Sequence, residues 1–364
     1  MNKMKKYLSL ILVLALWLSL TAFAWLKPSE AFSDSERRHL AQFPELSGET
    51  LLSGKFMSKF ADYAVDQFPL RDGWRSLNAM LSLALGQKDN NGLYLHDGYI
   101  VKMDYPMNEE MVNFAADRFE DLYNMYLTEN ENVFFAIVPD KGYYLAEEAG
   151  ALAPDYEKLF DLLEGRFDWA RFIDLTGVLS ADSYDRTDTH WRQEALIPVA
   201  QALGDAMGVP VRTEYEIEKA WWDFKGVYYG QAALPLKGED LNWLVWPGME
   251  DVVVYSHDSG MEVPLYNSDK LLSRDPYESY LSGNMALLTV TNPNAQTDRR
   301  LVVFRDSFGS SIVPLLIDSY AQITLVDTRY MNPGMVGQFV DFEGADVLMI
   351  YSTLVMNSSS ALRK

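Results

Sequence analysis

Short apolar runs alternate with longer amphipathic segments along most of this chain. Mainly apolar runs at 133–138, 285–291, 301–304, 323–326 and 347–351 predict buried strands. Apolar residues at helical spacing predict helices at 54–68, 69–86, 107–130, 155–164, 193–207 and 312–320. Because strands and helices alternate, we predict an α/β fold with a mostly parallel sheet, preceded by an N-terminal helical segment.

The N-terminus carries the longest apolar run. Residues 7–26 contain no charge and follow Lys3, Lys5 and Lys6. Such a run is long enough to span a hydrocarbon core of about 30 Å. Its length favours an uncleaved anchor whose lysine-rich end is cytoplasmic, whereas Ala22-Phe23-Ala24 also suits cleavage of a signal peptide. We therefore expect 1–28 to be a signal peptide or N-terminal membrane anchor, and the remainder to be extracellular, held at the membrane or secreted.

Composition divides the exported part further. We expect 29–100 to form a helical lead and a hairpin that turns at Asp97-Gly98. Residues 101–364 then form the main domain, in which 211–282 is an insertion rich in Trp, Tyr, Gly and Pro.

Charge and residue usage exclude several classes of function. The chain has 52 acidic and 31 basic residues, a formal net charge of −21, which repels nucleic acid. It has no cysteine, so disulfides, thiolate metal sites and a cysteine nucleophile are excluded. It has no HExxH motif and no glycine-rich nucleotide loop. We therefore expect no metal site, no cofactor and no nucleic-acid partner.

Asp188 and His190 stand out in a polar, turn-like segment. A histidine acts as a general base when a carboxylate fixes its tautomer, and a residue two positions away can supply that carboxylate. The competing interpretation is a surface histidine with a chance acidic neighbour.

Ser307 follows the predicted strand at 301–304 and precedes a predicted helix. Open α/β sheets place reactive groups at such strand ends, where helix N–H groups can bind an anion. The alternative is that Ser307 only caps the next helix. Together, Asp188, His190 and Ser307 are the parts of an acyl-transfer triad.

Several short blocks carry a resemblance. Thr187-Asp188-Thr189-His190-Trp191 resembles the D-x-H-W signature of the alginate O-acetylation proteins and of the DHHW family of Gram-positive bacteria, both similar to SGNH hydrolases. Arg305-Asp306-Ser307-Phe308 resembles the nucleophile block of the DHHW family. Further blocks at 66–72, 91–99 and 327–330 occur in the same order. Thr189 stands where the family name has its first histidine, a position that the alginate-type pattern leaves free.

The resemblance implies a three-layer αβα SGNH-like domain with Ser307 as nucleophile, His190 as general base and Asp188 as its orienting carboxylate. SGNH enzymes use a Gly and an Asn as oxyanion donors, and Gly283-Asn284 is the best local match; a plain turn is the alternative.

Two further residues are candidates for substrate binding. Trp191 has the chemistry to stack on a sugar, or it supports the histidine loop. Arg305 either holds a substrate group or pairs with an acid.

The function implied is an exported O-acetyltransferase or acetylesterase that acts on a cell-surface or extracellular polysaccharide through an acetyl-serine intermediate. The resemblance also implies a multi-pass membrane acyltransferase as acetyl donor. The alternative is a non-catalytic SGNH-like module that binds glycan or acts as a scaffold in the cell envelope.

Overall fold

The computed structural model describes the backbone of residues 2–363 and the side chains of residues 7–363. The predicted cytoplasmic flank of Lys3, Lys5 and Lys6 therefore lies outside the described side chains. The chain forms two compact units. One contains the residues up to 87 together with 230–235, and the other contains 88–229 and 236–364.

The smaller unit is mainly helical. Helix α1 (Asn2–Leu26) includes a segment, Tyr7–Leu26, with mean hydropathy 2.2 and no buried residues, long and apolar enough to cross a membrane. A signal sequence has the same properties, so both predicted forms of this segment fit α1. The predicted helices at 54–68 and 69–86 are present as α3 (Lys55–Asp66) and α4 (Arg71–Ala84). The unit also contains β1 (Phe32–Ser33), β2 (Arg38–His39) and the short helix α2 (Gly48–Leu52).

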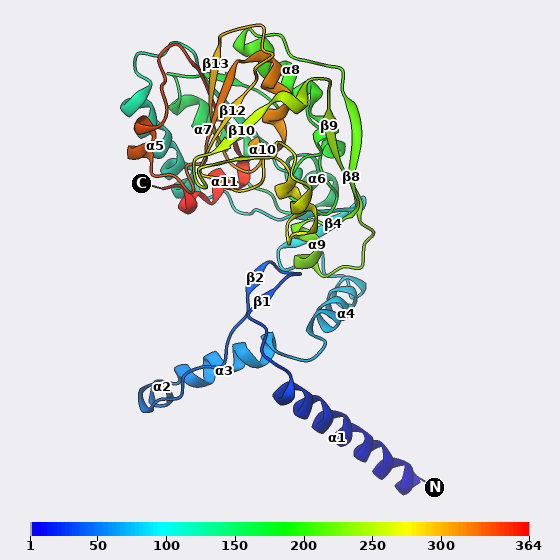
Figure 1. Ribbon diagram of the computed structural model, residues 1–364. Helices are drawn as coiled ribbons and strands as arrows, with labels where there is room; N and C mark the ends of the chain where they lie inside the picture. The colour runs from blue at the N-terminus through cyan, green and yellow to red at the C-terminus, as the bar shows by residue number, and fades with distance from the viewer. Residues whose placement is uncertain (1, 364) are drawn as a thin grey trace. The chain divides into compact units, whose positions relative to one another are not determined.

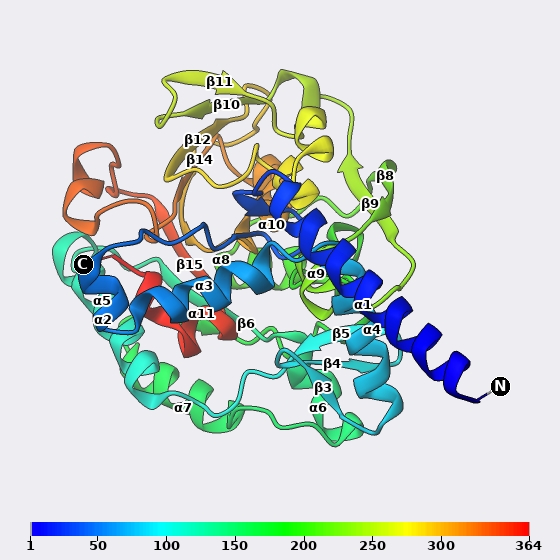
Figure 2. The ribbon, with the colours of Figure 1, turned by 90° about the horizontal axis from the view of Figure 1, so that it is seen from below.

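An eight-stranded sheet forms the centre of the larger unit. Its order is β11-β10-β12-β14-β13-β15-β6-β7, and the five strands from β14 to β7 are parallel to one another. Antiparallel pairing of β12, β10 and β11 extends the sheet beyond β14, as Figure 2 shows. The mostly parallel sheet predicted from the sequence is confirmed. The strands are β6 (Val133–Val138), β7 (Arg171–Ile173), β10 (Val253–Ser256), β11 (Met261–Val263), β12 (Leu287–Thr291), β13 (Arg300–Arg305), β14 (Gln322–Val326) and β15 (Asp346–Ser352).

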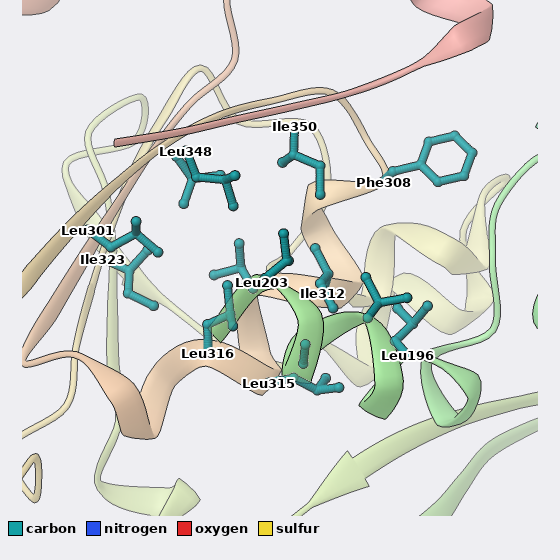
Figure 3. Close-up of a cluster of buried hydrophobic side chains, with 14 of the residues drawn as sticks. Leu196, Leu203, Leu301, Phe308, Ile312, Leu315, Leu316, Ile323, Leu348 and Ile350 are labelled. Carbon is teal, nitrogen blue, oxygen red and sulfur yellow. The ribbon is translucent and has the colours of Figure 1, made fainter. Parts of the chain in front are cut away.

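Helices cover both faces of the parallel half, which gives three layers (Figure 1). One core lies between the sheet and the segments α8 (Ile197–Met207), α10 (Gly309–Ile312) and the 3-10 helix Val313–Ser319. Figure 3 shows Leu203 and Ile312 from this layer facing Leu301, Leu348 and Ile350 of the sheet. The opposite core is built on α5 (Glu109–Tyr126), α7 (Tyr156–Arg166) and α11 (Thr353–Asn357). The predicted αβα arrangement is therefore confirmed.

Some elements differ from the expectation. The helix predicted at 312–320 is mostly 3-10, because Pro314 cannot donate an α-helical hydrogen bond. The helix predicted at 193–207 begins at Ile197, after a 3-10 turn. Helix α6 (Lys141–Ala149) was not predicted, although Asp140 caps it.

The remaining elements of the larger unit are small. The predicted hairpin is present as β4 (Leu93–His96) and β5 (Tyr99–Lys102), joined to β3 (Asp89–Asn90). The aromatic-rich region contains a second hairpin, β8 (Glu216–Phe224) with β9 (Glu239–Val245), and a 3-10 turn at Pro276–Ser279. Helix α9 (Val227–Ala232) follows β8, and its last three residues are counted with the smaller unit.

Candidate active site

Polar residues collect where the parallel strands end. Strand β13 is followed by Asp306 and Ser307, and β15 ends at Ser352. The Asp306 carboxylate accepts the Phe308 backbone N–H at 3.0 Å and the Ser352 backbone N–H at 2.8 Å. Asp306 thus fixes the turn that bears Ser307 to the neighbouring strand. This position is the one from which open α/β sheets present reactive groups.

Ser307, His190 and Asp188 form a continuous chain of hydrogen bonds. His190 Nε2 lies 2.8 Å from Ser307 Oγ, and His190 Nδ1 lies 2.5 Å from Asp188 Oδ1. Asp188 is fully buried and His190 is 6% exposed. Because Nδ1 faces a carboxylate, it carries the proton, which leaves Nε2 free to accept the Ser307 hydroxyl proton. The structure thus brings together three side chains that the sequence separates by more than one hundred residues.

Backbone groups hold the Asp188 carboxylate in place. Its Oδ1 also accepts the His190 backbone N–H at 3.1 Å, and Oδ2 accepts the Val227 backbone N–H at 2.7 Å. Gly226 allows this approach, since a Cβ at that position would lie 2.2 Å from Asp188 Cβ. Hydrogen bonds to the charged form of a carboxylate favour that form. These bonds therefore fix the Asp188 carboxylate in the orientation that faces His190 Nδ1.

Aromatic rings enclose the imidazole. The Tyr277 ring is stacked on His190, with ring centroids 3.8 Å apart. The Phe308 ring lies tilted beside the imidazole, with centroids 5.0 Å apart. The Tyr277 hydroxyl lies 2.7 Å from Ser311 Oγ, and burial raises the pKa of Tyr277 well above its ordinary value. The phenol is therefore neutral, and its ring covers one face of the imidazole.

Trp191 and Arg305 were predicted as possible substrate contacts, and the structure corrects this. Both side chains are fully buried. Trp191 Nε1 donates to Ser311 Oγ at 2.8 Å and to the Phe308 carbonyl at 3.2 Å, so it supports the histidine loop. Arg305 donates to Ser310 Oγ and lies 3.7 Å from the Asp327 carboxylate. These are the structural alternatives that the sequence left open.

Gly283 and Asn284 lie on a turn before β12. The Gly283 N–H donates to the Tyr280 carbonyl at 3.1 Å, and the exposed Asn284 amide donates to Glu278 at 3.1 Å. Among the described residues, no hydrogen bond joins either of them to Ser307. Their role as oxyanion donors stays a prediction, and their N–H groups have other partners here.

Several supporting residues were missed by reasoning from sequence. Gly226, Glu239 and Tyr277 lie in the aromatic-rich region, where nothing in the pattern marks them. Lys141 is not one of them, because its place after the apolar run at 133–138, at a strand end, marks it in the sequence as a candidate for the cleft. The predicted active-site residues came from local motifs, whereas these contacts depend on how distant elements meet.

One cluster outside this site has the donor atoms for a metal ion. His96, Asp97 and Glu148 bring their ligand atoms within 4.8 Å of one another. Asp97 and Glu148 are exposed, and this cluster includes none of the three active-site residues.

No protein-family model matches the sequence, and no curated protein matches it. Solved structures that resemble the chain include a DHHW family protein from Eubacterium siraeum, with 18% identity and TM-score 0.57, over 76% of this chain and 98% of that one. Bacillus cereus PatB1 with a sulfonyl adduct has 16% identity and TM-score 0.59, over 75% of this chain and 97% of its own. The O-acetyltransferase domain of Pseudomonas putida AlgJ has 13% identity and TM-score 0.47, over 73% and 92%.

The first two comparisons show a shared fold that covers nearly the whole of both solved chains. The resemblance to the DHHW family, which the sequence blocks indicated, is thus confirmed at the level of the fold.

Proposed function

We propose that this protein is an exported serine acyltransferase or esterase that forms an acetyl-enzyme on Ser307. The observation that carries the proposal is the hydrogen-bonded chain from Ser307 Oγ through His190 to Asp188. A lone serine at a strand end would need neither a correctly oriented histidine nor a buried carboxylate behind it. The non-catalytic module predicted as the alternative gives no reason for this arrangement.

The geometry supports a two-step acyl transfer. As Ser307 Oγ attacks the acyl carbonyl, His190 Nε2 takes the hydroxyl proton, and the imidazolium is stabilised by Asp188. Collapse of the tetrahedral intermediate breaks the bond to the leaving oxygen, which takes the proton from His190. An acceptor hydroxyl then repeats the sequence in reverse and leaves Ser307 free. Water as acceptor gives an esterase, and a sugar hydroxyl gives a transferase.

The developing oxyanion needs donors close to Ser307. Among the hydrogen bonds of the described residues, none uses the Ser307 backbone N–H, whereas that of Phe308 is taken by Asp306. The Ser307 N–H is therefore our first candidate, with Asn284 as the side-chain donor that would have to leave Glu278. Removal of one such donor typically costs about 10²–10³-fold in rate.

Substrate and location rest on other features. Helix α1 supports an exported protein held at the membrane or released from it. The D-x-H-W signature at 188–191, which resembles that of the alginate O-acetylation proteins, supports an acetyl group and an extracellular polysaccharide acceptor. By the same resemblance, a multi-pass membrane acyltransferase would supply the acetyl group.

Acylation of Ser307 tests the proposal directly. We would incubate the full chain in detergent with 4-nitrophenyl acetate and search the peptide that contains Ser307 for an added acetyl group by mass spectrometry. We expect acetyl-Ser307 in the wild type and none in His190→Ala. The Ser307→Ala variant is expected to lose ester turnover as well.

A sulfonyl fluoride provides an independent probe of the nucleophile, and PatB1, which shares the fold, has been solved with a sulfonyl adduct. We expect the sulfonyl group on Ser307 and slower labelling in His190→Ala. Ester turnover that persists in Ser307→Ala would contradict the mechanism. Glycan binding without acylation or labelling would favour the non-catalytic module.

A further inference from the structure

The loop that carries Asp188 and His190 is held by a buried lysine. Lys141 is the first residue of α6, directly after β6, and is 2% exposed. Its Nζ donates to the Asp185 carbonyl at 2.9 Å and contacts the Arg186 carbonyl at 3.4 Å. The ammonium also lies 5.2 Å from the centre of the Tyr228 ring. Lys141 thus binds the backbone carbonyl groups of residues 185 and 186.

The Glu239 carboxylate holds the same loop by accepting hydrogen bonds from the backbone N–H groups of the loop. Its Oε2 accepts the Arg186 backbone N–H at 2.8 Å. Its Oε1 accepts the Thr187 backbone N–H at 2.9 Å and the Thr187 hydroxyl at 2.8 Å. Glu239 lies on β9, far from Lys141 in the sequence. Two opposite charges from separate elements therefore bind the carbonyl and amide groups of one strap, residues 185–187, immediately before Asp188.

Burial disfavours the charged form of Lys141, whereas the acids around it favour that form. Burial lowers the pKa of Lys141 to about 8, while the neighbouring acids, with Asp188 the strongest, counteract that effect. The other acids that act on the ammonium are Glu239, Asp185 and Asp140. Burial also raises the pKa of Asp185 and of Asp140, so neither is a strong counter-ion. Asp188 and Glu239 are therefore the acids that most favour the charged form of Lys141.

We propose that Lys141 and Glu239 are positioning residues that clamp the strap 185–187 and so set Asp188 and His190 against Ser307. The inference rests on the proposed function, but one of the two readouts of its test needs no acyl transfer. Neither residue touches the reacting atoms, so neither is catalytic. Their effect is on distance: a displacement of about 1 Å in a catalytic group can cost about 10²-fold in rate. A buried ammonium suits this role because it binds two backbone carbonyl groups at one point.

The test combines two variants with two readouts. Lys141→Met removes the charge in a side chain of similar length, and Glu239→Gln keeps the shape while weakening the bonds to Arg186 and Thr187. The first readout is the rate of acetyl-Ser307 formation in the full chain in detergent. The second is the low-field proton NMR signal of the His190 Nδ1–H···Asp188 hydrogen bond, which needs no substrate. We expect acylation to fall about 10²-fold in each variant with KM for the ester little changed, and the signal to be lost or broadened.

Lys225→Met is the matched control. Lys225 also lies over a tyrosine ring, that of Tyr229, and pairs with an acid, Asp223, but it does not bind the strap. We expect wild-type rate and NMR signal in this variant. If Lys141→Met does not fold, Glu239→Gln alone decides the question.

The outcomes separate this inference from the proposed function. Variants that keep both the acylation rate and the NMR signal would overturn the clamp and leave the function intact. A wild type that shows the NMR signal but never acylates Ser307 would overturn the function. Loss of the signal in the two variants would support the clamp even then.

Discussion

The imidazole of His190 lies flat against the ring of Tyr277, with centroids 3.8 Å apart and planes 6° apart. An aromatic face carries negative potential, so it attracts a cation placed over it. In the proposed mechanism, His190 becomes a cation when it takes the Ser307 proton. The stack is therefore stronger in the protonated state than in the resting state, which is the property that accelerates a chemical step.

Replacement of Tyr277 tests the value of that stack. We expect Tyr277→Leu to lower the rate of Ser307 acylation about 10-fold, from a cation–π contribution of about 0.5–2 kcal/mol. Tyr277→Phe keeps the ring and loses only the hydrogen bond to Ser311, so we expect a smaller loss. The measurement is single-turnover acylation with 4-nitrophenyl acetate. Equal losses in both variants would show that the hydroxyl, and not the ring, is what matters.

Trp191→Phe separates a structural role from a substrate contact. The substitution keeps an aromatic ring in the core but removes the N–H that binds Ser311 and Phe308. Since Ser311 then loses a buried partner, we expect the free energy of unfolding to fall by about 1–3 kcal/mol. KM for a carbohydrate ester should be unchanged. Trp222→Phe, at an exposed position, is the control and should be neutral within about 0.5 kcal/mol. A rise in KM with unchanged stability would restore Trp191 as a substrate contact.

The Asp327 carboxylate is the charge partner of two arginines. It accepts two hydrogen bonds from the Arg329 guanidinium and lies 3.7 Å from Arg305. Removing one member of a buried ion pair typically costs about 3–5 kcal/mol, because the other charge remains buried without a partner. We expect Asp327→Asn to lower the free energy of unfolding by about that amount, measured by urea denaturation.

Asp341→Asn is the matched control for Asp327→Asn. Asp341 pairs with Arg300 at 2.9 Å but is exposed. A surface pair contributes at most about 1 kcal/mol. If the free energy of unfolding fell by the same small amount in both variants, the stability of the buried cluster would not depend on the charge of Asp327.

Much of this architecture could be predicted because local patterns decide it. The run at 133–138 has the same bounds as β6, since a fully apolar segment that ends at Pro139 has few alternatives. Asp188, His190 and Ser307 were also found locally, as a carboxylate and histidine two apart and as a serine after a strand. The structure adds the 2.8 Å contact that joins them.

The parts that sequence did not predict depend on long-range packing. Tyr277 stacks on His190 from a turn 87 residues away, and Glu239 reaches the strap from the β8–β9 hairpin. For a similar reason, the sequence left both a structural and a substrate-binding interpretation open for Trp191 and Arg305. A motif shows that a side chain is adjacent to the site in sequence, but only the fold shows whether it faces solvent or the core.

The buried Lys141 predicts a stability that depends on pH in a defined direction. In the unfolded chain this lysine keeps its proton up to its ordinary pKa of 10.5, whereas in the folded protein it loses it at a pKa of about 8. Between these two values the unfolded state binds more protons, so the free energy of unfolding rises with pH. The gap corresponds to about 3 kcal/mol as an upper bound.

Comparison with Lys141→Met isolates this contribution from that of other titrating groups. We expect the free energy of unfolding of the wild type, relative to the variant, to be constant below pH 7 and to increase from about pH 8 to 10.5. Urea denaturation of both proteins across this range measures the difference. Because the charged lysine destabilises the fold at neutral pH while Lys141→Met is expected to slow acylation, the two measurements together would show that the cation is kept for the geometry of the site. A difference that does not change with pH would mean that burial does not lower the pKa of Lys141 in the folded protein.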